Sequence, residues 1–126
     1  MSPLEEGQGA HFYPPAPFGS EIIISCNAKA AIIQHAPGRL FYDGLEDIQY
    51  QIRPIEDELA MLRLFGADPL AITLNNQNCT TAQLLEHKGN LIERTQLPVF
   101  RILEEGVDEL AQIVESFYLN YRRDRE

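Results

Sequence analysis

The sequence predicts an α/β fold with a mostly parallel sheet flanked by helices. Three short apolar runs, at residues 30–35, 69–74 and 97–100, have the length and composition of buried strands. Between and after them lie three stretches whose apolar residues recur at helical spacing. This alternation is the order of right-handed βαβ units on a parallel sheet. The 126 residues, 44% of them hydrophobic and 23% charged, fit one domain of this class.

The two ends of the chain differ in composition from the part between them. Residues 1–19 contain four of the eight prolines and three of the eight glycines, which predicts a loop or an extended arm. The α/β domain is expected from 20 to 121. Residues 122–126 are all charged, and we expect a frayed tail there.

The first elements of the domain follow from local sequence. Residues 20–28 are ambiguous, because three successive isoleucines favour a strand, whereas a serine followed by a glutamate at the start could open a helix. The strand at 30–35 is closed by Pro37-Gly38. A helix with acidic first turns is expected to begin at Pro54 and to end at Gly66. Its apolar residues are Ile55, Leu59, Leu62 and Phe65.

Two further helices are expected in the second half of the chain. Thr80 or Thr81 can cap a helix that has Gly89 as a weak point inside it. Its apolar residues are Leu84, Leu85, Leu91 and Ile92. The last helix is expected at about 106–121. The residues of its single apolar stripe are Val107, Leu110, Ile113, Val114 and Phe117. The aromatic residues expected at its core and rim are Phe117, Tyr118 and Tyr121.

Charge and composition exclude several classes of function. A formal charge of −9 argues against a binder of the nucleic-acid backbone, because such proteins need a basic face. No apolar run is long enough to span a bilayer, and the first residues do not have the pattern of a secretory signal. Cys26 and Cys79 are isolated, which is typical of reduced thiols in a cytoplasmic protein. We therefore expect an acidic cytoplasmic protein with no nucleic-acid or membrane partner.

The strongest local candidate for a binding site follows the first strand. His35 and Arg39 flank a Pro-Gly turn, and ligands of open α/β sheets lie just outside the carboxyl ends of the strands. An arginine fork and a histidine donor could bind a carboxylate or a phosphate. The alternative is a structural turn in which Arg39 pairs with acidic residues of the next loop. Asn75 occupies the same place after the second strand, where holding the loop is the favoured role and ligand binding the alternative.

Other motifs in the chain are weaker. Gly7, Gln8 and Gly9 could form a loop that approaches a phosphate, but the pattern GxxxxGK followed by Ser or Thr does not occur. A nucleotide site held by this chain alone is therefore not expected. The histidines lack metal-ligand spacing, and no GxSxG elbow marks a hydrolase.

Several of these motifs occur together in the order found in one family. From about residue 5 to residue 115, the chain resembles the carboxyl-terminal part of the D-glutamate N-acetyltransferase-like proteins, once catalogued as a domain of unknown function. The motifs that carry the resemblance are Gly7-Gln8-Gly9, His11 to Pro17, Gln34 to Arg39, Ala71 to Asn75, Leu97-Pro98-Val99 and Gly106-Val107-Asp108.

This resemblance implies a more specific fold. In the family, a Rossmann-like domain precedes a carboxyl-terminal domain with a P-loop NTPase-like fold, similar to dethiobiotin synthetase. The chain would then be a partial P-loop NTPase-like three-layer sandwich, the carboxyl-terminal half of that second domain. The resemblance also makes 20–28 a helix, and we adopt a helix there. The Rossmann-like domain and the phosphate-binding loop lie outside the 126 residues.

The resemblance further implies a site and a reaction. His35 is the candidate catalytic residue, and the candidate ligand-binding residues are Gly7, Gln8, Gly9, Arg39 and Asn75. The substrate would be D-glutamate or a related amino acid, and acetyl-CoA the possible acyl donor. No cofactor is expected to be held by this chain alone, and catalysis would need residues from outside it. The alternative is a non-catalytic interaction module that forms homo-oligomers, or binds a partner chain, through an exposed sheet edge.

Overall fold

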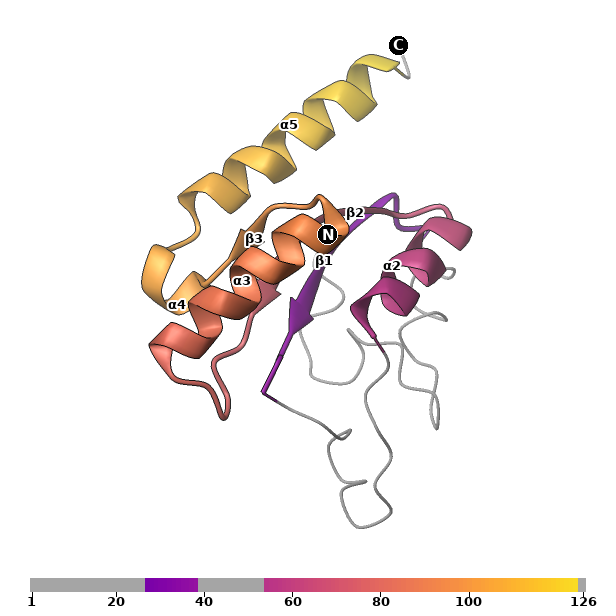
Figure 1. The fold of residues 1–126 in the computed structure, drawn as a ribbon. Helices are drawn as coiled ribbons and strands as arrows, with labels where there is room; N and C mark the ends of the chain where they lie inside the picture. Colours follow the sequence, from indigo (N-terminus) through magenta and orange to yellow (C-terminus); the bar gives the residue numbers. More distant parts are fainter. Residues whose placement is uncertain (1–26, 39–53, 125–126) are drawn as a thin grey trace.

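The computed structural model describes residues 27–38 and 54–124 (Figure 1). Within these residues the chain forms a three-stranded sheet of β1 (Ala30–His35), β2 (Asp68–Leu74) and β3 (Val99–Phe100). The strands lie in the order β1-β2-β3, and both pairs are parallel. The predicted α/β class with a parallel sheet is therefore confirmed.

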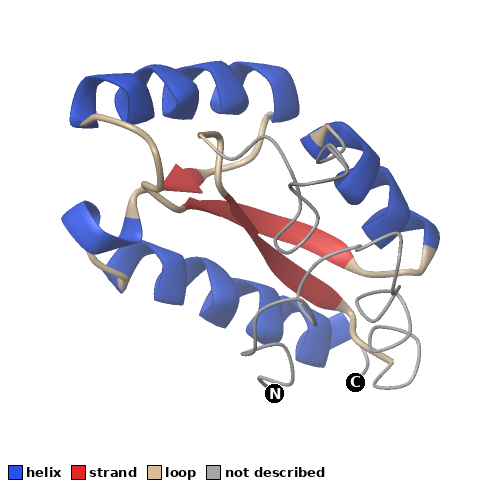
Figure 2. Cartoon of the chain, turned by 90° about the horizontal axis from the view of Figure 1, so that it is seen from below, coloured by secondary structure: helices blue, strands red, loops and turns tan. Residues whose placement is uncertain are grey.

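Helices cover both faces of this sheet. The described helices are α2 (Ile55–Leu64), α3 (Thr81–Thr95), α4 (Ile102–Glu105) and α5 (Asp108–Asp124). Figure 2 shows α2 and α3 on one side of the strands and α5 along the other, with α4 at the end of the sandwich. Right-handed crossovers that follow one another in the order β1-β2-β3 place α2 and α3 on the same face, and α5, after the last strand, forms the third layer.

α2 has sequence signals at both of its ends. Pro54, with a φ of −54°, is its N-cap, and three acidic residues occupy the first turn. Gly66 follows the helix with a φ of +83°, a conformation that L side chains rarely adopt. The helix buries Ile55, Glu58, Leu59 and Leu62, a stripe at helical spacing that includes three of the four apolar residues predicted to form it.

α3 begins with a capping box. The Thr80 hydroxyl accepts a hydrogen bond from the Gln83 amide at 3.1 Å, and the Gln83 side chain accepts one from the Thr80 amide at 2.9 Å. Of the two threonines considered, Thr80 is therefore the cap. Leu84 and Leu91 are buried, whereas the other two members of the predicted stripe are about half exposed. The helix thus attaches to the sheet through a narrow line of contacts.

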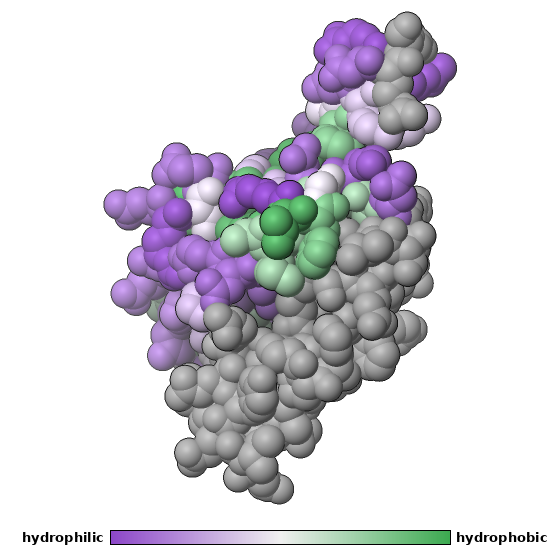
Figure 3. All heavy atoms as spheres, turned by 90° about the vertical axis from the view of Figure 1, so that its right-hand side faces the viewer, coloured by the Kyte–Doolittle hydropathy of each residue, from purple (hydrophilic) through white to green (hydrophobic). Residues whose placement is uncertain are grey.

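α4 and α5 depart most from the sequence expectation. The short helix α4 was not predicted, and α5 begins at Asp108, after Gly106 with a φ of +80°. α5 continues through Asp124, so the first three residues of the predicted tail are helical. Figure 3 shows the carboxyl-terminal end of α5 projecting from the body of the molecule, with a hydrophilic surface.

The apolar stripe predicted for the last helix is only partly covered by the rest of the described residues. No residue of α5 is buried: Val114 is 41% exposed and Tyr118 is 57% exposed. Phe117 and Tyr121 are half-buried and stack on each other, with ring centroids 6.0 Å apart. The helix contacts β2, but the three described strands are too few to cover its apolar face.

The core lies between the sheet and the α2–α3 layer. Its buried residues are Ala28, Ile33, Ile55, Leu59, Leu62, Ala67, Ile72, Leu74, Leu84, Leu91 and Val99. Within the described part of the chain, no helix has the length and apolarity needed to cross a bilayer. The predicted arm at 1–19 and most of the predicted helix at 20–28 lie outside the described residues. Asn27 and Ala28, its last two residues, are not helical.

Candidate functional site

The carboxyl edge of the sheet brings three polar residues into one row. His35 ends β1, Asn75 follows β2, and Arg101 follows β3. Because the strands are parallel and in register, with His35 opposite Leu74 and Thr73 opposite Phe100, the three strand ends lie at one level. This is the edge at which open α/β sheets bind ligands.

The first two members of the row are linked through the backbone. The Asn75 amide donates a hydrogen bond of 2.8 Å to the His35 carbonyl oxygen. The Asn75 side-chain oxygen accepts a hydrogen bond of 2.8 Å from the Gln77 amide. This second bond is the loop-holding role that the sequence favoured for Asn75. It also fixes the direction of the carboxamide at the strand end.

A close contact joins the loops that follow β1 and β2. A Cβ atom added at Gly38 would lie 2.3 Å from the Gln77 carbonyl oxygen and 2.8 Å from the Cys79 sulfur. Glycine is required at this turn because the second loop leaves no room for a side chain. The Pro-Gly turn predicted after the first strand therefore holds the two strand-end loops together.

Arg101, at the end of β3, is the residue of the row that the sequence reasoning missed. Its side chain is 17% exposed, and its Nε atom lies 3.3 Å from a carboxylate oxygen of Glu105. The same carboxylate accepts the Arg101 amide at 2.8 Å and binds Lys88 of α3 at 2.7 Å. A basic residue directly after the third apolar run was the available sequence signal.

This cluster has an excess of positive charge. Burial raises the pKa of Glu105, but hydrogen bonds from Lys88 and from the Arg101 amide, together with both positive charges, outweigh burial and lower that pKa below its usual value. Glu105 is therefore ionised at neutral pH. Two cations then share one carboxylate, and the Nε of Arg101 is buried without a hydrogen bond within the described part of the protein. Such a group can bind an anion.

The charge of His35 acts on an acidic residue of α2. Glu56, in the first turn of α2, forms an ion pair with Arg94 of α3, whose Nε donates to it at 2.8 Å. Burial raises the pKa of Glu56, but its own backbone amide, Arg94 and the charge of His35 outweigh burial and lower that pKa. His35 is thus within electrostatic reach of a carboxylate that remains charged at neutral pH.

A second carboxylate on α2 has the opposite behaviour. Glu58 is only 7% exposed, on the side of α2 that carries Leu59 and Leu62. Burial raises its pKa to about 7. The sequence predicts only that this acidic residue lies in the first turns of the helix, where the helix dipole favours a negative charge. Its burial instead makes it a group that exchanges a proton near neutral pH.

The remaining predicted site residues are not described by the structure. Gly7, Gln8, Gly9 and Arg39 lie outside residues 27–38 and 54–124. The structure therefore brings together His35 and Asn75 of the six predicted residues and adds Arg101 to them. Among the described residues, no three His, Cys, Asp or Glu side chains are grouped so that they could hold a metal ion.

The described residues form an α/β domain with helices on both faces of a parallel sheet and polar residues at the carboxyl ends of its strands. Residues 4–111 match the family model described as "Domain of unknown function (DUF1611_C) P-loop domain". The chain therefore belongs to the DUF1611 family. No curated protein gave a significant match.

A solved structure shows the same fold. The crystal structure of a DUF1611 family protein from Anabaena variabilis is similar to this chain with a TM-score of 0.72 and 18% sequence identity. The similarity covers 88% of this chain and 34% of the Anabaena chain. The chain thus spans about a third of the length of that relative.

Proposed function

We propose that this chain is the carboxyl-terminal part of a D-glutamate N-acetyltransferase-like protein and that its strand ends bind an anionic group of substrate or acyl donor. The observation that carries the proposal is the row of His35, Asn75 and Arg101 at the carboxyl edge of the parallel sheet. The cluster at Arg101 has two cations and one carboxylate, although the whole chain has a formal charge of −9. A local positive excess in an acidic protein favours anion binding there.

The proposed site combines residues that the structure describes with residues outside 27–38 and 54–124. Arg39 holds an anionic group, and Gly7, Gln8 and Gly9 are further ligand-binding residues of the site. His35 orients the group or moves a proton, since the imidazole can titrate near neutral pH. In this proposal the phosphate-binding loop is supplied by another chain or by residues outside the given sequence, and this chain is not catalytic by itself. In this proposal D-glutamate is the acyl acceptor and acetyl-CoA the donor, and the protein works in the cytoplasm.

The proposal is tested first by ligand-dependent stability. Acetyl-CoA, D-glutamate and nucleotides are each added to the chain in a thermal-shift experiment, because a ligand that binds only the native state raises the melting temperature. A larger protein containing this chain is then titrated by calorimetry with the same compounds. We expect Arg39→Ala to abolish binding, and Arg63→Ala, at an exposed position in the last turn of α2, to leave it unchanged. Binding that survives Arg39→Ala would remove Arg39 from the site.

The second candidate function is a non-catalytic module that associates with itself. The observation that favours it is the position of β1 at an edge of the described sheet, together with the exposed apolar face of α5. Edges and apolar faces of this kind promote association. A chain that stays monomeric on dilution and concentration in light scattering would contradict this candidate, and a ligand-induced rise in melting temperature would favour the first.

A further inference from the structure

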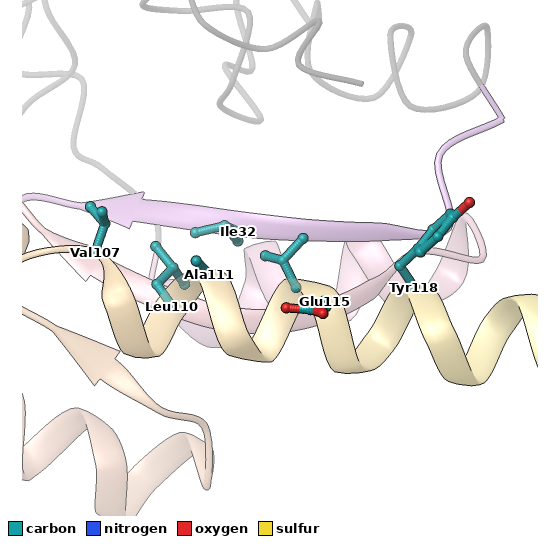
Figure 4. A pocket seen from close by; sticks show the side chains of 7 residues that line it. Ile32, Val107, Leu110, Ala111, Glu115 and Tyr118 are labelled. Atoms are coloured by element: carbon teal, nitrogen blue, oxygen red, sulfur yellow. The ribbon is translucent and has the colours of Figure 1, made fainter.

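An exposed apolar surface of the described residues lies between α5 and β1. A groove of about 510 Å³ separates Ile32 of β1 from the helix, and Val107, Leu110, Ala111, Val114 and Tyr118 line its other side (Figure 4). We call these five residues, four on α5 and Val107 directly before it, the α5 face. Val107 is 54%, Val114 41% and Tyr118 57% exposed. A continuous apolar face of this kind marks an interaction surface.

The charges beside the α5 face have a regular order. Asp108, Glu115 and Arg122 are seven residues apart, so they lie on the same side of the helix, along one flank of the α5 face. Asp108 is in the first turn, Arg122 is in the last turn, and Glu115, in the middle, lines the groove. The flank therefore changes from negative to positive along the helix.

This order of charges selects one way of pairing two copies of α5. In a two-fold symmetric, antiparallel pair, each flank meets the same flank of the other helix in the reverse direction. Asp108 then lies opposite Arg122 of the second copy, twice, and Glu115 opposite its own copy once. In a parallel two-fold pair, this flank of one helix lies on the opposite side of the pair from the same flank of the other helix, so the three charges do not meet. The charges are complementary only in the antiparallel arrangement.

We propose that the α5 face docks against the α5 face of a second copy of this chain, with the two helices antiparallel. This inference rests on the second candidate function, self-association, and assigns it to α5 rather than to the edge of β1. An acidic helix such as α5, with four acidic and two basic residues, fits its own copy better than an anionic membrane surface.

The first test removes the apolar contact. Sedimentation velocity of the whole chain over a range of concentrations gives the dimer dissociation constant. We expect Val114→Glu to weaken the dimer at least 10-fold, because it puts a charge into the centre of the α5 face. Leu103→Glu is the matched control: Leu103 is 79% exposed on α4, outside the groove, and its change should leave the constant within about 2-fold.

The second test uses charge reversal along the flank. Asp108→Arg and Arg122→Asp should each weaken the dimer several-fold, and the double variant should restore it, since the reversed charges again face each other. The two residues are 14 positions apart, about 21 Å along one helix, so they cannot contact each other within one chain. Restoration therefore reports an antiparallel contact between chains. Glu115→Gln should tighten the dimer by removing the one like-charge pair.

The possible results separate this inference from the functions proposed above. A dimer that is indifferent to Val114→Glu and shows no coupling between positions 108 and 122 would overturn docking through α5, while self-association by another surface would stand. A chain that is monomeric at all concentrations would overturn both. If Val114→Glu lowers helix content in circular dichroism, the restoring double variant still decides the question, because it keeps the apolar face intact.

Discussion

The two faces of the sheet carry helices of similar pattern but very different burial. On one face, α2 and α3 bury Leu59 at 3%, Leu62 at 2% and Leu84 at 1% exposure. On the other face, the longer helix α5 has an equally regular apolar stripe and buries no residue. A helical stripe shows that a helix has a contact surface, but the strands and helices opposite that surface decide whether it is covered.

The difference should appear most strongly in the effect of truncating one leucine on each face. We expect Leu59→Ala on α2 to lower the free energy of unfolding by about 2–5 kcal/mol, because it leaves a cavity in the core. Leu119→Ala on α5, at a side chain 52% exposed, should lower it by less than about 1 kcal/mol. Urea denaturation of both variants at one low protein concentration measures the two values. Equal losses would show that α5 is as much part of the core as α2.

Glu58, a buried carboxylate of α2, should make the free energy of unfolding depend on pH near neutrality. Burial raises the pKa of Glu58 from 4.5 to about 7 in the folded state. The unfolded chain therefore releases this proton more readily, so stability is full below about pH 4.5 and falls as the pH rises through 7. By pH 8 the loss is on the order of 3 kcal/mol. We expect Glu58→Gln to recover much of it in denaturation at pH 8.

The control for Glu58 is Glu93, an exposed carboxylate on α3 of the same helical layer. Glu93→Gln changes an exposed residue of α3 and should leave the fall in stability between pH 5 and 8 as it is in the unmodified chain. If Glu58→Gln has the same pH profile as Glu93→Gln, the burial of Glu58 does not control the pH dependence.

The strand-end loops and the interior of α3 should respond in opposite directions to the same substitution. Gly38→Ala places a Cβ against the Gln77 carbonyl oxygen and should lower stability by about 1–3 kcal/mol. Gly89→Ala meets no atom within 4 Å inside a helix and should raise stability by about 0.5–1 kcal/mol. Thermal denaturation of both variants gives the sign of each change. A neutral Gly38→Ala would mean that the two loops separate at little cost.

The smallest expected effect concerns the start of α3. Thr80→Ala removes the hydroxyl that accepts the Gln83 amide and breaks the capping box, with an expected loss of about 1 kcal/mol. Thr80→Ser keeps the acceptor and should lose only a few tenths of a kcal/mol. Equal losses in urea denaturation would show that the methyl group, and not the cap, matters at this position.

Local signals predicted the element order better than they predicted the candidate site. Pro54, Gly66 and Thr80 set helix ends through backbone rules that act within one turn, so the structure has those ends close to the predicted places. The two-residue strand β3 and the four-residue helix α4 have few residues to form a pattern, and α4 was missed. Arg101 was missed because its importance depends on Lys88 of α3, which only the fold brings to Glu105, the neighbour of Arg101 one helical turn away.

The sequence by itself determined the α/β class, the helix boundaries at caps and glycines, and the positions of His35 and Asn75 at strand ends. These features depend on residue spacing and on backbone preferences over a few positions. Only the tertiary structure decided that Glu58 is buried, that Gly38 meets the neighbouring loop and that the α5 face stays open. Burial and close approach depend on what lies opposite a residue in space, which its own neighbours in sequence do not specify.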